Sequence, residues 1–260
     1  MPMEYIGFQG PRPATISSWL PTQNCNLSLR QQRLYPTEQL LTKEFPLETW
    51  CKSGATTEVL VNLIKTRIAK AIKRHHHIII YLWSGTCDLT TKEGKYIKLK
   101  FHNNRAIKII EDQYKRAISI IDSYQHAEIK FIDCPLISIS NWNKSKGHKR
   151  PETYKVEDFL ATKQIQELNG KIYELNRRLN KTSVKISKYF FRGRKRRKGQ
   201  TRKSVNLSIN NKDGIHPGRL LSLAITKNIL LDTYTECFTI DQESEFIQIR
   251  VEQEELNSLF

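Results

Sequence analysis

Short apolar runs alternate with segments of helical periodicity along most of this chain. Ile78–Trp83 is apolar throughout, as expected for a central strand that is covered on both faces. Residues 129–139 form a second largely apolar run, in which Pro135 marks the strand end or a bulge. Elsewhere, apolar residues recur at spacings of three and four. This periodicity predicts helices over residues 60–72, 107–124 and 157–180.

Weaker signals complete a pattern of about five strands, with the additional strands at residues 14–20, 45–51 and 184–191. Glu93 and Gly94 mark a hairpin-like insert, and Pro217 suits the first turn of a last helix. Strands that alternate with helices are typical of βαβ units. The pattern therefore predicts an α/β fold with a mostly parallel sheet.

Composition and charge narrow the class of protein. The 260 residues carry 43 Lys and Arg against 26 Asp and Glu, a formal net charge of +17. With 38% apolar and 27% charged residues, a folded domain with polar insertions fits and wholesale disorder does not. No apolar run approaches the roughly 18 residues that span a bilayer. Because the N-terminus also lacks a signal-peptide pattern, we expect an intracellular protein, cytoplasmic or nuclear, with no membrane partner.

The distribution of sequence features suggests three parts. Residues 1–13 are expected to be an N-terminal extension, and residues 14–235 one domain. Residues 236–260 contain seven acidic residues against the single basic residue Arg250, and are expected to be a tail or an added strand.

Cysteine and histidine patterns give no sign of a metal site. The five cysteines are spread without any C-x-x-C pair, which favours reduced thiols over a disulfide framework or a zinc ribbon. Three consecutive histidines, residues 75–77, precede a strand, where only alternate residues share a face. No Asp, Glu or Cys nearby in the sequence completes a metal shell for them. We therefore expect neither a metal nor a cofactor.

Three short turns follow predicted strands, where ligands bind in open parallel sheets. They are Ser53-Gly54-Ala55-Thr56, Gly85-Thr86-Cys87-Asp88 and Asp213-Gly214-Ile215-His216-Pro217. Taken singly, each is an ordinary turn or helix cap. In order and spacing they resemble the sequence blocks of the SGNH (GDSL-type) hydrolase family, across roughly residues 14–235. The D-G-I-H-P segment is the most specific match.

The resemblance implies a three-layer, flavodoxin-like α/β fold and an acyl-ester small molecule as substrate. In active members of the family, a serine attacks the acyl carbonyl and a histidine takes its proton. By resemblance, His216 would be the base, Asp213 would orient its imidazole, and Gly54 would donate to the oxyanion.

Two departures from the family pattern indicate an incomplete site. Cys87 replaces the asparagine whose amide would donate to the oxyanion, and a thiol is a weak donor. No G-D-S block exists, and aligning Gln23-Asn24-Cys25 with it puts Cys25 at the nucleophile position. The expected result is a degenerate member, a pseudoenzyme with weak or no ester hydrolase activity. SGNH-like domains also occur in some retroelement-encoded proteins. A working Cys25–His216 pair stays open as an alternative.

A basic segment is the second functional signal. Residues 181–203 contain eleven Lys and Arg and no acidic residue, which accounts for +11 of the net charge. These cations could neutralise nucleic-acid phosphates without sequence specificity, or serve as a nuclear-import signal. They could equally form a solvated loop that the acidic C-terminal segment neutralises. The competing hypothesis is thus a nucleic-acid-binding accessory protein on a hydrolase scaffold, with its contacts at Arg192, Arg194, Lys195, Arg196, Arg197 and Lys198. The oligomeric state is left open.

Overall fold

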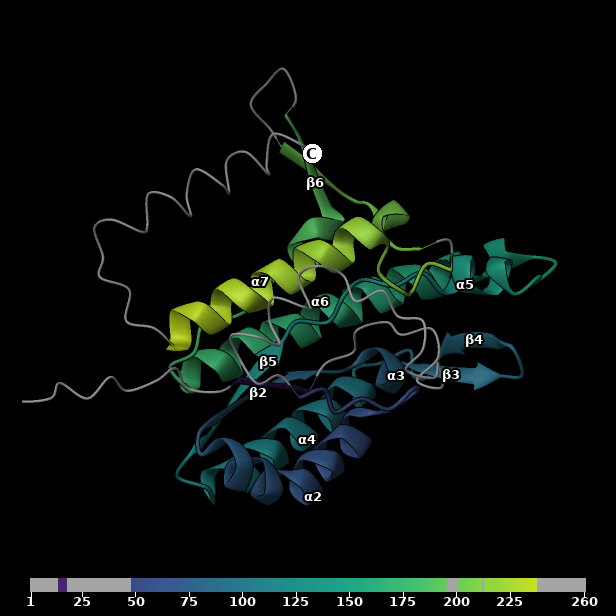
Figure 1. Ribbon diagram of the computed structural model, residues 1–260. Coiled ribbons are helices and arrows are strands. Elements are labelled where there is room, and N and C mark those ends of the chain that lie inside the picture. The colour runs from purple at the N-terminus through teal and green to yellow at the C-terminus, as the bar shows by residue number, and fades with distance from the viewer. Residues whose placement is uncertain (1–13, 18–47, 196–200, 212, 238–260) are drawn as a thin grey trace, which may run out of the picture.

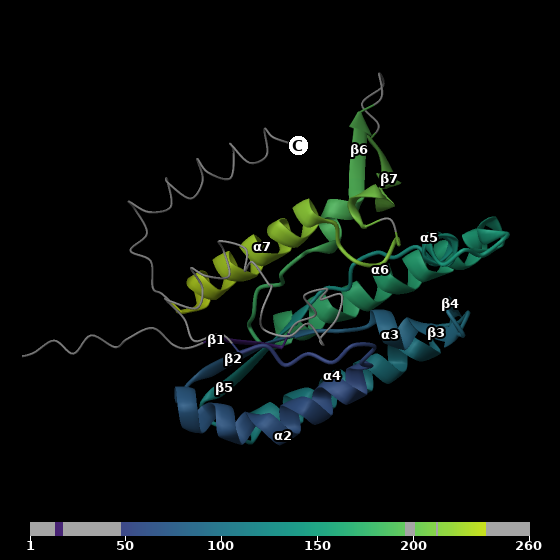
Figure 2. The ribbon, with the colours of Figure 1, turned by 45° about the vertical axis from the view of Figure 1, so that its right-hand side comes forward.

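Helices cover both faces of a small parallel sheet (Figure 1). The structure is a computed structural model that describes residues 14–17, 48–195, 201–211 and 213–237. Helices α2 (Thr57–His75) and α4 (Arg105–Asp122) lie on one face. Helices α6 (Lys155–Arg178) and α7 (Arg219–Cys237) lie on the other, as the turned view also shows (Figure 2). The predicted α/β class with a parallel sheet is confirmed.

The sheet consists of β1 (Ala14–Ser17), β2 (Ile78–Trp83) and β5 (Ala127–Ile132), in the order β1-β2-β5. Both strand pairs are parallel, with Leu82 opposite both Ser17 and Phe131. All six residues of β2 are buried, because helices cover both faces of the central strand. In the described residues this sheet has three strands instead of the five that the sequence predicts.

Two predicted strands are absent from this sheet. Residues 48–51, the described part of the predicted strand at 45–51, contain only a single bridge residue, Thr49. Residues 184–191 form an irregular stretch and a 3-10 turn, η2 (Ser187–Phe190), so the prediction of a strand there is wrong.

A buried carboxylate explains why residues 184–191 do not form a strand of the sheet. Asp133 accepts hydrogen bonds from the backbone N–H groups of Ile186 and Ser187. These N–H groups therefore cannot pair with a strand. Val184, Ile186 and Phe190 are nevertheless buried. The apolar run that suggested a strand reflects the burial of an irregular segment.

The helix and hairpin predictions are confirmed, with helix ends that differ from the predicted ones by two or three residues. The insert after β2 consists of α3 (Thr86–Leu89) and an antiparallel hairpin of β3 (Thr90–Glu93) and β4 (Tyr96–Leu99). Short helices lie between the longer elements: α5 (Ile139–Ser145), η1 (Pro151–Tyr154) and η3 (Leu207–Ile209). The basic segment forms a separate antiparallel ribbon of β6 (Phe191–Lys195) and β7 (Thr201–Val205).

Side chains of α6 take the place of a neighbouring strand beyond the end of β5. The Asn169 side chain accepts from the backbone N–H of Cys134 at 2.7 Å and donates to its carbonyl at 2.9 Å. Backbone groups buried here would otherwise lack partners. The helix is thus fixed to the sheet edge by hydrogen bonds as well as by apolar packing.

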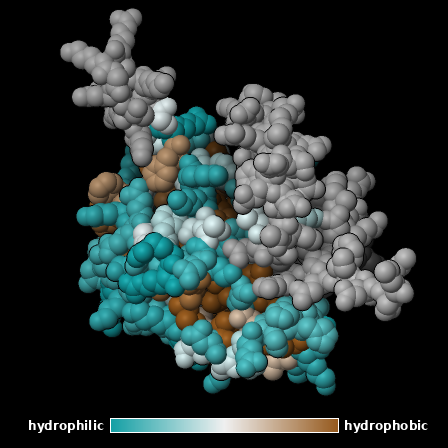
Figure 3. Space-filling model, turned by 90° about the vertical axis from the view of Figure 1, so that its left-hand side faces the viewer, coloured by the Kyte–Doolittle hydropathy of each residue, from teal (hydrophilic) through white to brown (hydrophobic). Residues whose placement is uncertain are grey.

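Polar residues cover most of the described surface on the side shown in Figure 3, and apolar residues show between them, most extensively in the lower part of the view. Among the helices of the described residues, none has the length and apolar composition needed to cross a membrane.

Candidate active site

A pocket opens at the carboxyl ends of β2 and β5, where ligands bind in sheets of this kind. It encloses about 450 Å³, including space open to solvent. Two of the three turns singled out in the sequence meet here, and the third reaches it through Ala55. The described lining consists of Ala55, Trp83, Ser84, Gly85, Thr86, Cys87, Pro135, Ile215, His216 and Pro217.

His216 and Asp213 form the hydrogen-bonded pair that the sequence suggested. Asp213 Oδ2 lies 2.7 Å from His216 Nδ1. The other carboxylate oxygen accepts from the backbone N–H groups of Ile215 and His216, each at 3.0 Å. Burial opposes ionisation of Asp213, but these hydrogen bonds outweigh it and hold the pKa of the carboxyl below its usual value. The pair therefore consists of an ionised carboxylate that orients an imidazole at the pocket wall.

Several contacts hold the segment that carries this pair. Gly214 has a φ of +74°, and a Cβ there would lie 2.5 Å from the Cβ of Asn141, so only glycine fits. The Gly214 carbonyl accepts from the Ser138 backbone N–H at 2.9 Å and from the Asn210 side-chain amide at 3.0 Å. The ring of Trp142, on α5, lies 5.9 Å from that of His216. These contacts fix the orientation of the imidazole relative to the pocket.

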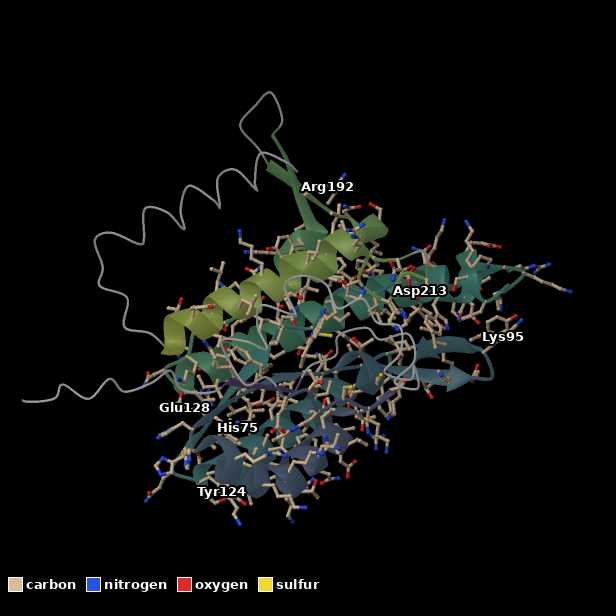
Figure 4. All side chains as sticks on the ribbon, viewed as in Figure 1. His75, Lys95, Tyr124, Glu128, Arg192 and Asp213 are labelled. Carbon is tan, nitrogen blue, oxygen red and sulfur yellow. The ribbon has the colours of Figure 1, made fainter. Side chains whose placement is uncertain are left out.

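The location of Asp213 agrees with a site at the carboxyl ends of the strands. Figure 4 shows it at the opposite end of the molecule from His75, Tyr124 and Glu128. Glu128 is the second residue of β5, so these three residues mark the amino ends of the strands.

The turn after β2 places Cys87 at the pocket. Gly85 has a φ of +120°, and a Cβ there would lie 2.9 Å from Leu168 and 3.3 Å from the sulfur of Cys134. Burial, reinforced by the neighbouring Asp88, raises the pKa of the Cys87 thiol to about 11. The thiol is therefore neutral at neutral pH, which makes it a poor nucleophile and a weak hydrogen-bond donor.

A buried carboxylate in α3, just after β2, is bonded to the first residue of α2. Asp88 accepts from the backbone N–H of Thr57 at 2.9 Å and from its hydroxyl at 2.8 Å. The Thr57 hydroxyl oxygen also lies 3.0 Å from that of Ser84, which in turn lies 3.0 Å from the Tyr114 hydroxyl. Burial raises the pKa of Asp88 in spite of these bonds. The sequence analysis assigned no role of its own to Asp88, which it named only within the Gly85-Thr86-Cys87-Asp88 turn. Nothing in the sequence pattern pointed to Thr57 or Ser84.

The remaining predicted site residues are placed as follows. Gly54 lies in the exposed turn before α2 with a φ of +70°, and its neighbour Ala55 lines the pocket. Cys25 lies outside the described residues. Arg192 is exposed on β6, which also contains Arg194 and Lys195. Arg196, Arg197 and Lys198 are outside the described residues.

In the part of the chain that the structure describes, no group of three or more His, Cys, Asp or Glu side chains could hold a metal ion. His75 contacts Glu48 at 2.7 Å, and the rings of His77 and His126 meet edge to face at 4.4 Å. Two of the three histidines that precede β2, His75 and His77, therefore contact Glu48 and another histidine ring.

Comparison with known proteins gave matches among solved structures only. No family model matches the chain, and no curated protein does. Four chains of solved structures match. One of them is a GDSL-like lipase from Bacteroides thetaiotaomicron, which is 16% identical over 76% of this chain and 80% of the lipase chain, with a TM-score of 0.47.

Proposed function

We propose that this protein is an SGNH-hydrolase-like protein with an incomplete site for acyl-ester hydrolysis, so that its esterase activity is weak or absent. The observation that supports this most strongly is the Asp213–His216 pair, 2.7 Å apart at the wall of a pocket at the carboxyl ends of the strands. The glycine turn at Gly85 shares that pocket, in the order and spacing of the family's blocks.

The arrangement of the site supports a specific catalytic role for each residue. His216 would take the proton from an attacking hydroxyl, thiol or water, and would return it to the leaving alcohol. Asp213 would hold the imidazole in the required orientation. By the family resemblance, the backbone N–H of Gly54 would donate to the oxyanion, and Asp88 would hold the nearby start of α2 through Thr57. The apolar lining, Trp83 and Pro135 among it, would accommodate a short acyl chain.

Cys87 weakens the oxyanion side of this site. In the family pattern an amide donates from this position, whereas a neutral thiol is a weak donor. Losing one oxyanion donor costs about 3 kcal/mol of transition-state stabilisation, or roughly a hundredfold to a thousandfold in rate. The nucleophile position falls on Cys25 by resemblance, and loss of a triad nucleophile in another hydrolase costs about a million-fold in turnover. Together these changes leave a pocket with a base and its orienting carboxylate but little turnover.

Hydrolysis of 4-nitrophenyl acetate tests this proposal. The purified chain should hydrolyse the ester at a rate within about tenfold of its His216→Ala and Cys25→Ala variants. Fast hydrolysis that both substitutions abolish would instead establish a working Cys25–His216 pair and overturn the incomplete site. Far-UV circular dichroism of all three proteins checks that the fold is unchanged.

A further inference from the structure

The basic segment forms a β-ribbon that stands away from the rest of the molecule. β6 and β7 pair only with each other among the described strands, and project beyond α7 in both ribbon views (Figures 1 and 2). Five of the ten strand residues are cations and none is acidic. The cations are Arg192, Arg194, Lys195, Arg202 and Lys203.

The register distributes these cations over both faces of the ribbon. Arg194 is paired with Arg202, and Arg192 lies two residues from Arg194, so these three share one face. Lys195 and Lys203 fall on the other face. A ribbon that packs on a core shows one apolar face. Phe191 and Val205 lie on the same face as Lys195 and Lys203, at the base of the ribbon, where Phe191 packs against the core. Because neither face is apolar beyond this base, the charge pattern there does not serve folding.

Positive charge continues from the ribbon onto the body of the protein. Lys185 and Lys188 are exposed just before β6. Their ammonium groups lie 5.2 Å and 5.1 Å from the ring centroids of Tyr173 and Tyr189. The base of the ribbon therefore combines cations with partly exposed aromatic rings, the combination that binds phosphates and bases.

We propose that this ribbon is a binding surface for duplex DNA, which it engages through the phosphates without sequence specificity. A five-residue strand is about 17 Å long, and a two-stranded ribbon fits the major groove of B-form DNA, about 12 Å wide and 8.5 Å deep. The major groove of A-form RNA is too narrow to admit it. Phosphate contacts fix the position of a protein on a duplex and carry no sequence information. The proposal is independent of ester hydrolysis.

Fluorescence anisotropy with a labelled 20-base-pair DNA duplex tests the proposal, using the full chain over a range of salt concentrations. If all five ribbon cations contact phosphates, log K should fall against log salt concentration with a slope of about −4.5. The variant with Arg194→Gln, Lys195→Gln, Arg202→Gln and Lys203→Gln should lose about 3.6 of that slope, and most of its affinity at low salt.

A matched variant distinguishes the effect of the ribbon cations from the effect of the net charge of the protein. Lys65→Gln, Arg67→Gln, Lys70→Gln and Lys73→Gln remove the same four charges from exposed positions on α2, on the other face of the sheet. This variant should bind duplex DNA with nearly the affinity and salt slope of the unaltered chain. Equal losses in the two variants would overturn the proposal, as would tighter binding to the single strand or to an RNA duplex of the same sequence.

Discussion

Asn176 pairs with the backbone of Phe131 as a neighbouring β-strand would. Its side-chain oxygen accepts from the Phe131 N–H at 2.9 Å, and its amide nitrogen donates to the Phe131 carbonyl at 2.8 Å. One side chain on α6 thus satisfies the N–H and the carbonyl of Phe131, on the edge of β5 that faces away from β2. An exposed strand edge invites pairing with other chains, and here the helix closes it.

Replacing Asn176 with leucine should therefore destabilise the fold. The change leaves a buried N–H and a buried carbonyl unpaired, and should lower the free energy of unfolding by about 2–4 kcal/mol. Urea unfolding measures this difference. Gln166→Leu, at an exposed position of the same helix, should change it by less than about 0.5 kcal/mol. Similar costs at the two positions would show that the Asn176 bonds contribute nothing beyond helix composition.

The sequence predicted helices well and strands less well, for a physical reason. The helical stripes at α2, α4 and α6 recur over four or more turns, and each is buried as expected. In α6 the stripe also contains the buried Asn169 and Asn176, which apolar spacing alone does not identify. Because these side chains occupy the outer edge of β5, a further apolar run could not join the sheet there. An apolar pattern shows that a segment is buried but not what it pairs with.

In the candidate site too, contacts between residues close in the sequence were predicted and contacts between distant residues were not. The family resemblance pointed to the Asp213–His216 pair, and these two residues, three positions apart, bond within a single turn. The bond from Thr57 to Asp88 joins residues that are 31 positions apart, and depends on how α2 meets the turn after β2. Spacing in the sequence does not reveal a contact between residues so far apart, so the role of Asp88 in bonding to Thr57 was not predicted.

Gly85 should not tolerate alanine, whereas Gly94 should. A Cβ at Gly85 would lie 2.9 Å from Leu168, in addition to the strain of a φ of +120°. Gly94 has a φ of +61° and nothing within 4 Å of an added Cβ. We expect Gly94→Ala to cost about 1 kcal/mol of unfolding free energy and Gly85→Ala about 2–4 kcal/mol. Equal costs in denaturant unfolding would mean that the contact with Leu168 does not constrain the turn.

Cys87 should react slowly with alkylating reagents near neutral pH. With its pKa raised to about 11 by burial, only about one Cys87 thiol in a thousand is ionised at pH 8. Mass spectrometry after iodoacetamide treatment should show Cys87 modification that is slow at pH 8 and rises about tenfold at pH 9. A rate at pH 8 typical of an exposed thiol would contradict a neutral Cys87 at the pocket.

The stability contribution of Asp213 should depend on pH in a defined direction. The folded state lowers the pKa of this carboxyl below its usual value of 3.8. Its stabilising effect is therefore complete above that value, and is lost as the pH falls through the lower folded-state pKa. The difference in unfolding free energy between the unaltered chain and Asp213→Asn should therefore shrink as the pH falls from 5 to 2. A difference that stays constant to pH 2 would contradict the assigned bonds.

We propose that Asp213 and His216 belong to a hydrolase-like site that lacks an oxyanion amide and a serine nucleophile. Restoring both tests it most directly, by measuring 4-nitrophenyl acetate hydrolysis in the double variant Cys25→Ser, Cys87→Asn. Relative to the unaltered chain, the rate should rise at least about a hundredfold, and adding His216→Ala should abolish the increase. No increase, or an increase that survives His216→Ala, would contradict the account.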